Sequence, residues 1–178
     1  MTTDSAAQRL VRHIRDVPDF PRPGILFKDI TPLLRDPETL RLACEGLAAG
    51  FLAERVDLVV GIESRGFIFG SIVAQNLGAG FVPIRKPGKL PWTTRRHEYI
   101  LEYGSDALEM HEDAIRKGDR IALVDDLLAT GGTMGAACKL VERCGATVVA
   151  CLFVIELAAL KGRERLGGRK VESLLIYE

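Results

Sequence analysis

Apolar residues along the chain form two kinds of pattern, one typical of buried strands and one typical of helices. Short and nearly continuous apolar runs cover residues 57–62, 80–86, 120–126 and 146–157. Between them, apolar positions recur three or four residues apart over 37–51, 66–77 and 132–144. The first kind is typical of strands covered on both faces, and the second of amphipathic helices. Their alternation predicts an α/β fold with a Rossmann-like, doubly wound and mostly parallel sheet.

Residues with strong capping preferences mark the ends of the predicted helices. Asp36 followed by Pro37 predicts a helix start, because Asp is a favoured N-cap and Pro is favoured at the first helical position. Gly78 and Gly145 follow the last apolar positions of the next two helices, where glycine is the preferred terminating residue.

The N-terminal segment combines one helical pattern with a heavily punctuated stretch. Ser5 and Gln8 have the spacing of a capping box, and the apolar spacing after them predicts a helix that continues to Val17. Residues 18–34 then contain four prolines and one glycine. So many prolines argue against a regular helix or strand, yet the stretch is rich in apolar residues. We expect a structured, partly buried loop that lines a binding site.

A basic segment interrupts the alternation of strands and helices before the strand at 120–126. Its five basic residues, Arg85, Lys86, Lys89, Arg95 and Arg96, all precede the first acid, Glu98. Residues 99–104 and 106–111 then alternate apolar and polar side chains, as a β-hairpin does. We expect residues 86–108 to form an inserted hairpin that acts as a flexible lid.

The composition of the chain is that of a single globular domain and argues against nucleic-acid-binding and membrane proteins. A chain of 178 residues with 47% hydrophobic residues suits one globular domain, residues 1–178. Its 24 basic residues are balanced by 24 acidic ones, so we expect no nucleic-acid partner. The longest apolar stretch, 146–155, is shorter than the roughly 20 residues that span a bilayer. The first residues also lack the apolar core of a signal peptide, and we therefore expect no membrane association.

The cysteines favour a reducing compartment. Cys44, Cys138, Cys144 and Cys151 include no C-x-x-C pair and lie within apolar patterns. We interpret them as buried thiols of a cytoplasmic protein, with a disulfide or a metal site as the alternative.

The clearest chemical signal lies in residues 120–133. The apolar strand ends in two adjacent carboxylates, Asp125 and Asp126, and a short glycine-containing loop leads directly into a helix. Glycine lets main-chain N–H groups approach a ligand closely, and the N-terminus of a helix carries partial positive charge. These features predict a cradle for a phosphate monoester, made by Ala129, Thr130, Gly131, Gly132 and Thr133. Carboxylates beside it suit vicinal hydroxyls, so the segment predicts a ribose-5-phosphate site.

The alternative for this segment is a strand–turn–helix that binds no ligand, in which the acids are solvated and the glycines only turn the chain. Two other phosphate motifs are absent, because neither G-x-x-x-x-G-K-[ST] nor G-x-G-x-x-G occurs in the chain.

The string LVDDLLATGGT, residues 123–133, resembles the motif with which type I phosphoribosyltransferases bind 5-phospho-α-D-ribose 1-diphosphate (PRPP). Its version with Leu127, Leu128 and Ala129 resembles the adenine-specific branch of that family. Residues 20–34, 61–70, 83–91, 98–104 and 160–166 resemble further segments of the same branch, in the same order. The resemblance implies the family's fold, with a small N-terminal hood at residues 1–35, and a homodimer. It also implies the conversion of adenine and PRPP to AMP and diphosphate through an oxocarbenium-like transition state.

The resemblance also assigns roles to individual residues. Those implied to bind the diphosphate are Glu63, Ser64, Arg65, Arg85, Lys86 and Lys89, with a cis peptide between Glu63 and Ser64. Arg65 is further implied to assist catalysis together with Asp125 and Asp126, and Glu102 is implied to be the general acid near the purine. For Arg65, for the basic run and for Glu102, the alternative is an ordinary solvated side chain.

Adenine is expected between the N-terminal loop and the strand end at 127. Phe27 offers a flat surface for stacking, main-chain groups of Leu26 and Lys28 suit the edge of the base, and Leu127 covers its other face. The alternative for Phe27 is a core side chain. His13, His97 and His111 lack metal-ligand spacing, so we expect no protein metal site, and Mg²⁺ is expected to enter with the diphosphate of PRPP.

Two other functions remain open from the residues alone. One is a type I phosphoribosyltransferase that acts on a 6-oxopurine or on orotate. The other is a regulator that senses PRPP or a nucleotide without catalysis, for which the balanced charge of the chain offers no support.

Overall fold

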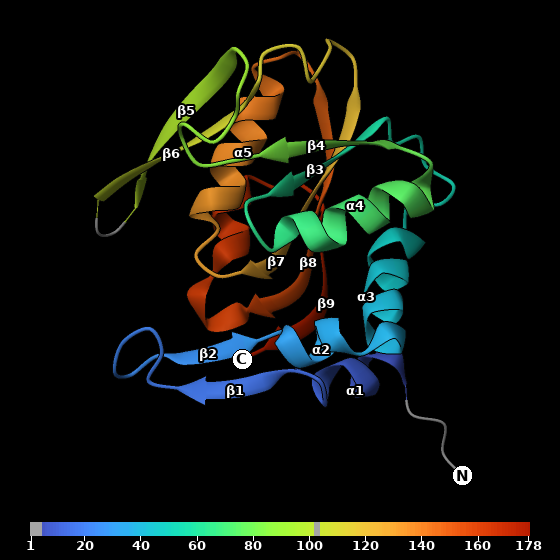
Figure 1. The fold of residues 1–178 in the computed structure, drawn as a ribbon, viewed down its shortest axis with the longest axis vertical. Helices are drawn as coiled ribbons and strands as arrows, with labels where there is room; N and C mark the ends of the chain where they lie inside the picture. The colour runs from blue at the N-terminus through green and yellow to red at the C-terminus, as the bar shows by residue number, and fades with distance from the viewer. Residues whose placement is uncertain (1–4, 102–103) are drawn as a thin grey trace.

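A single five-stranded parallel sheet forms the centre of the molecule (Figure 1). The computed structural model describes residues 5–101 and 104–178. The strands, in spatial order, are β4 (Gly80–Ile84), β3 (Leu58–Ile62), β7 (Arg120–Leu128), β8 (Thr147–Leu157) and β9 (Val171–Tyr177). All neighbouring pairs are parallel. The order reverses between β3 and β7, and ligands of doubly wound folds bind beyond the strand ends at such a switch point. The predicted fold class is confirmed.

Helices cover both faces of this sheet (Figure 1). The helices α3 (Pro37–Ala49) and α4 (Gly66–Leu77) lie on one face, and α5 (Gly132–Glu142) lies on the other. Successive strand residues divide between the two layers, because side chains alternate across a sheet. Val59 and Ala122 pack with the α3 and α4 side, whereas Val60 and Leu123 pack with the α5 side. Strands covered on both faces explain the continuous apolar runs in the sequence.

The helix signals at Asp36 and Gly78 are confirmed, and the one at Gly145 is not. The Asp36 carboxylate accepts a hydrogen bond from the Thr39 N–H at 2.8 Å, and Pro37 is the first residue of α3. Asp36 also ends the short helix α2 (Thr31–Arg35), so α2 and α3 share one residue. Gly78 ends α4 with a φ of +64°. The helix predicted to close at Gly145 ends earlier, at Glu142, and Gly145 lies in the turn that follows.

The N-terminal prediction is correct at its start and wrong after it. Ser5 and Gln8 form the reciprocal capping box, but α1 (Ala6–Val11) is only six residues long. Val17, predicted to be helical, lies in β1 (Arg15–Pro18), which pairs with β2 (Leu26–Asp29) as an antiparallel hairpin. The stretch expected to be an irregular loop therefore contains β2 and α2. Pairing with a strand distant in sequence outweighs the local helical spacing.

The lid segment contains the predicted hairpin. The strands β5 (Thr94–Leu101) and β6 (Gly104–His111) are antiparallel and form a two-stranded sheet, which a bridge between Arg85 and Glu109 joins to the end of β4. Buried residues of the hairpin, Tyr99, Leu108 and Met110, pack into the core layer on the α5 side. This contact places the hairpin alongside α5 (Figure 1).

The C-terminal segment holds elements that the sequence patterns did not reveal. Two 3₁₀ helices, η1 (Ala158–Leu160) and η2 (Gly162–Leu166), lead into the edge strand β9.

The four cysteines are free thiols, and three of them, Cys44, Cys138 and Cys151, are buried as expected. Among the helices of the described residues, none has the length and apolar character needed to span a bilayer.

Candidate active site

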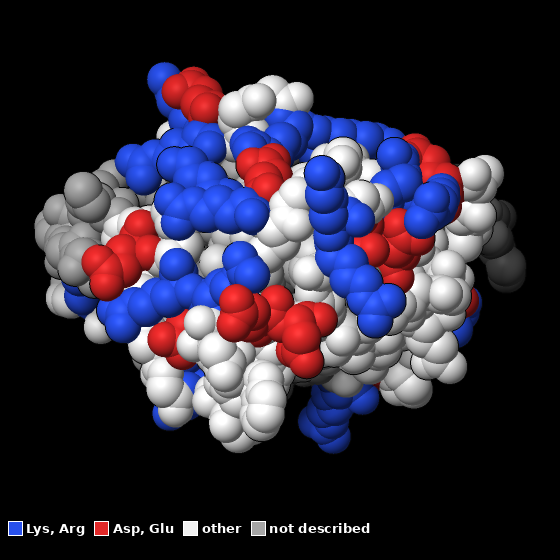
Figure 2. Space-filling view, turned by 90° about the horizontal axis from the view of Figure 1, so that it is seen from above, with Lys and Arg blue, Asp and Glu red and all other residues white. Residues whose placement is uncertain are grey.

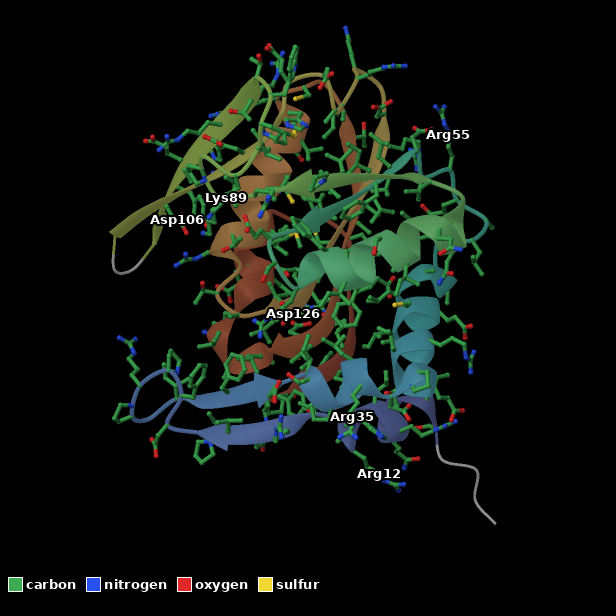
Figure 3. All side chains as sticks on the ribbon, viewed as in Figure 1. Arg12, Arg35, Arg55, Lys89, Asp106 and Asp126 are labelled. Atoms are coloured by element: carbon green, nitrogen blue, oxygen red, sulfur yellow. The ribbon has the colours of Figure 1, made fainter. Side chains whose placement is uncertain are left out.

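A cleft of about 450 Å³ opens at the switch point of the sheet, beyond the ends of β3 and β7. It is lined by Phe27, Glu63, Ser64, Arg65, Lys86, Asp125, Asp126, Leu127 and Thr133. All nine are residues that the sequence analysis singled out. Figure 3 shows Asp126 at the centre of the molecule, with Lys89 and Asp106 above it beside the hairpin.

The glycine-containing loop forms a smaller cavity of about 90 Å³ next to this cleft. Its lining consists of Asp125 and residues 127–134. The helix α5 begins in it, with Gly131 as N-cap at a φ of +77°, a conformation that side chains with a Cβ rarely adopt. The first N–H groups of a helix lack intrahelical acceptors and carry partial positive charge. The loop is therefore suited to an anion of phosphate size.

Gly162 supports this loop from behind, and the sequence analysis gave it no role. A Cβ on Gly162 would overlap the Ala129 carbonyl oxygen and would lie 2.7 Å from the Leu128 side chain. Glycine at this position lets the two backbones touch. The string at 160–166 belonged to the resemblance, but no local pattern connects it with the loop.

The two acids lie inside β7, because the strand continues to Leu128 and not only to residue 126 as expected. The Asp126 N–H donates to an Asp125 carboxylate oxygen at 2.9 Å. Burial raises the pKa of Asp125, and the Asp126 charge raises it further. Burial raises the pKa of Asp126 as well, although the Arg65 guanidinium opposes this shift.

Arg65 connects the acid pair with the aromatic side of the cleft. Its Nε lies 2.9 Å from an Asp126 carboxylate oxygen, and its guanidinium carbon lies 5.3 Å from the centre of the Phe27 ring. The Asp126 side chain is only 6% exposed, so this ion pair neutralises a buried charge. Arg65 stands at the N-cap position of α4, directly after the cis peptide between Glu63 and Ser64, which is present as expected.

Glu63 lines the cleft and also holds the basic segment in place. One of its carboxylate oxygens accepts a hydrogen bond from Arg85 at 2.9 Å, and the other accepts the Lys86 N–H at 2.8 Å. These partners lower the pKa of Glu63, with the Arg85 bond as the main cause. Arg85 also donates to the Lys89 carbonyl oxygen at 3.0 Å. Its guanidinium is thus committed within the segment and does not line the cleft, whereas the Lys86 side chain does.

The hood presents Phe27 to the cleft and turns Lys28 away from it. The Phe27 ring lies edge-on to Phe20, with 5.1 Å between ring centres. The Lys28 ammonium is bound to Asp16 at 2.6 Å and lies 4.2 Å from the centre of the Tyr177 ring. Leu26 and Lys28, two residues apart, present main-chain groups to the same edge of β2, and within the described residues β2 pairs with β1 and with no other strand.

Glu102, the expected general acid, and its neighbour Tyr103 lie outside the described residues. Within the described ranges, no group of three or more His, Cys, Asp or Glu side chains has the arrangement of a metal site.

Three comparisons with known proteins agree with this geometry. Residues 34–173 match the model of the phosphoribosyl transferase domain. The adenine phosphoribosyltransferase of Methylococcus capsulatus is 60% identical over 95% of this chain and 99% of its own length. A crystal structure of the adenine phosphoribosyltransferase of Thermoanaerobacter pseudethanolicus matches with a TM-score of 0.93 and 48% identity, over 96% of this chain and 99% of that one. The Saccharomyces cerevisiae enzyme, complexed with an imino-altritol bisphosphate and adenine, matches with a TM-score of 0.90 and 42% identity, over 96% and 98%.

A doubly wound sheet with a phosphate-sized cavity and an acid pair at its switch point defines a nucleotide-handling α/β protein. The chain belongs to the phosphoribosyltransferase family and, within it, to the adenine phosphoribosyltransferases.

Proposed function

We propose that the protein transfers the 5-phosphoribosyl group of PRPP to adenine, giving AMP and diphosphate. The observation that carries this proposal is the order of surfaces along one cleft. An apolar face at Phe27 and Leu127 is followed by the acid pair Asp125 and Asp126, and then by the adjoining cavity at the start of α5. A base, a ribose and a 5-phosphate follow one another in the same order in AMP. The relatives named above carry this activity in their names.

The cavity at residues 129–133 is the proposed site of the 5-phosphate. Main-chain N–H groups at the start of α5 and the hydroxyls of Thr130 and Thr133 would hold the phosphoryl oxygens. Binding at this remote group aligns the reacting carbon of the ribose with the base.

Asp125 and Asp126 are the proposed ligands of the ribose hydroxyls. As the bond from C1 of the ribose to the diphosphate breaks, positive charge develops on the sugar ring, and nearby carboxylates stabilise it. Arg65 keeps Asp126 paired before substrate binds and lies close enough to Phe27 to contact the leaving diphosphate beside the base. We propose that Arg65 turns from Asp126 toward the diphosphate when PRPP enters.

Adenine is proposed to stack on Phe27 and to be covered by Leu127. The free edge of β2 would read the base through main-chain groups of Leu26 and Lys28. The engagement of the Lys28 ammonium with Asp16 supports adenine over a 6-oxopurine, because it leaves this lysine unavailable to the exocyclic oxygen at position 6.

The diphosphate is proposed to bind Ser64, Arg65, Lys86 and Lys89, with Glu63 and Arg85 holding the segment in shape. Mg²⁺ would be carried by diphosphate oxygens and water, since Glu63 and Asp126 already have cationic or N–H partners. When bound, the ion neutralises charge on the leaving group. Glu102 is proposed as the general acid near the purine, on the resemblance alone.

We further propose that residues 1–178 act as one domain, with the hood at 1–35 on the base side and the segment 86–108 as a lid that excludes water. A homodimer in the cytoplasm is the proposed working form. No nucleic-acid or membrane partner is proposed. On the face seen in Figure 2, Lys and Arg side chains are interleaved with Asp and Glu.

The decisive experiment mixes the purified protein with PRPP, Mg²⁺ and one nucleobase at a time. AMP and diphosphate are expected with adenine, and no mononucleotide is expected with guanine, hypoxanthine, xanthine or orotate. Turnover of another base in place of adenine would reassign the substrate. Binding of AMP without turnover of any base would instead indicate a nucleotide sensor. Light scattering of the same sample tests the dimer, and a monomer would refute that part.

A further inference from the structure

The Lys86 ammonium lines the cleft, but its closest partners belong to the hairpin. It is bound to the Asp106 carboxylate and lies 3.4 Å from the Tyr99 hydroxyl. Tyr99 and Asp106 face each other across β5 and β6. The Tyr99 hydroxyl donates to Asp106 at 3.1 Å, so the three groups form one closed set of contacts.

The main chain of Lys86 is fixed, but its side chain is free to change partners. Its N–H is held by Glu63, which fixes the main chain at the mouth of the cleft. The Tyr99 hydroxyl also lies 3.5 Å from the Thr133 hydroxyl, which belongs to the loop at the start of α5. Thus the basic segment, the hairpin and the proposed phosphate site meet within one set of side chains.

The charges of this set favour an exchangeable ion pair. Burial opposes the charge on Lys86, but Asp106 and Tyr99 outweigh it and raise the pKa of the ammonium. Burial also opposes the charge on Asp106, but Lys86, together with the Ala107 N–H and the Tyr99 hydroxyl, outweighs it and lowers the pKa of that carboxyl. The two side chains are 41% and 29% exposed, so an incoming anion can reach Lys86 and compete with the carboxylate.

We propose that Asp106 is a positioning residue that holds Lys86 at the mouth of the cleft and releases it to the diphosphate of PRPP. The inference rests on the proposed function, because it takes a diphosphate as the anion that Lys86 receives. Binding then replaces the contact between Lys86 and the hairpin by a contact with the substrate. The carboxylate competes equally with PRPP and with the product diphosphate, so it weakens both and favours product release.

The test compares the affinities of PRPP and of inorganic diphosphate, each with Mg²⁺, by calorimetry without adenine. Asp106→Asn keeps the shape and removes the competing charge, and it is expected to tighten both ligands about fivefold, the upper range for a partly exposed ion pair. Tyr99→Phe is expected to tighten them less, because the carboxylate remains. Glu98→Gln is the matched control, since Glu98 is a hairpin acid that pairs with Arg96 and not with Lys86. It is expected to change neither affinity by more than about twofold.

The same substitution in a Lys86→Gln background separates this exchange from a general change of charge. In that background Asp106→Asn is expected to have no effect. Without the Lys86 ammonium, the Asp106 carboxylate and the diphosphate no longer compete for the same cation. Weaker or unchanged diphosphate binding in Asp106→Asn would overturn the proposal, as would tightening that persists without Lys86. A damaged structure cannot produce tighter binding. Failure of the unaltered protein to form AMP would instead refute the proposed function, which these binding measurements do not require.

Discussion

Gly131 and Gly162 lie back to back, and neither position has room for a side chain. A Cβ on Gly131 would overlap the Gly162 carbonyl oxygen and would lie 3.0 Å from its carbonyl carbon. The loop that starts α5 is therefore pressed against the turn between η1 and η2, more than thirty residues later in the chain. This contact sets the shape of the proposed phosphate site.

Substitution of Gly162 by Ala is expected to disturb the loop without touching the ligand. The added methyl group must displace backbone at Ala129, and overpacking of this kind costs about 1–3 kcal/mol. We expect a lower melting temperature and PRPP binding that is weaker by about tenfold, measured by thermal unfolding and calorimetry. Gly135→Ala is the control within α5, because its Cβ would make only an ordinary 3.4 Å contact. Equal losses in both variants would contradict the supporting role of Gly162.

The acid pair is expected to act mainly on turnover. Asp125→Asn combined with Asp126→Asn keeps the shape of the side chains and removes the charge that stabilises the developing oxocarbenium ion. We expect kcat to fall by about 100-fold or more, with a smaller change in PRPP affinity. Steady-state kinetics and a separate PRPP titration distinguish the two effects. A double variant with nearly unaltered kcat would exclude the proposed role.

The same pair gives a pH-dependent stability with a definite sign. The pKa of Asp125 and that of Asp126 are raised in the folded protein, so the folded state holds protons that the unfolded state has lost. The contribution of the pair to stability therefore falls as pH rises above the unfolded value of about 3.9. Denaturant unfolding of the unaltered protein and of the double Asn variant should show a difference that moves against the unaltered protein as pH rises above about 4. A constant difference would show that the pair is not perturbed.

Phe27 and Lys28, adjacent in β2, are expected to respond differently to truncation. Phe27→Ala removes the stacking surface and should raise the KM for adenine by about tenfold. Lys28→Met removes an ammonium that is bound to Asp16 outside the cleft, and should change that KM by no more than about threefold. A large loss of adenine affinity in Lys28→Met would show that its side chain, and not the main chain of β2, reads the base.

Local signals allowed part of this structure to be predicted, and long-range contacts account for most of what was missed. The start of α3 at Asp36 and the end of α4 at Gly78 depend on preferences of single residues, which the sequence displays. Val17 instead joins β1 because of Phe27, its partner ten residues later, and helical spacing gave the wrong answer there. The strand β9 is an edge strand that pairs with β8 among the described residues, and its apolar run is short and interrupted near its start by Glu172 and Ser173.

The candidate site divides in the same way. The motif at 123–133 and the residues at 63–65 end neighbouring parallel strands, so topology alone brings them together. The contacts of Gly162 and Asp106 join segments that are far apart in the chain, and neither residue belongs to a motif with a chemical meaning of its own. Arg85 was included with the diphosphate ligands because of its charge. Its engagement with Glu63 becomes visible only in three dimensions.

The single residue shared by α2 and α3 has a consequence for substrate traffic. Asp36 ends α2 and starts α3, so no flexible linker lies between the hood and the helix layer that covers the sheet. Ile30 and Leu33, both almost fully buried, further anchor that junction in the layer beneath α3 and α4. The side of the cleft that carries Phe27 is therefore held in a fixed position relative to the sheet. We expect adenine to enter and AMP to leave on the opposite side of the cleft, where Lys86 and the strands β5 and β6 lie.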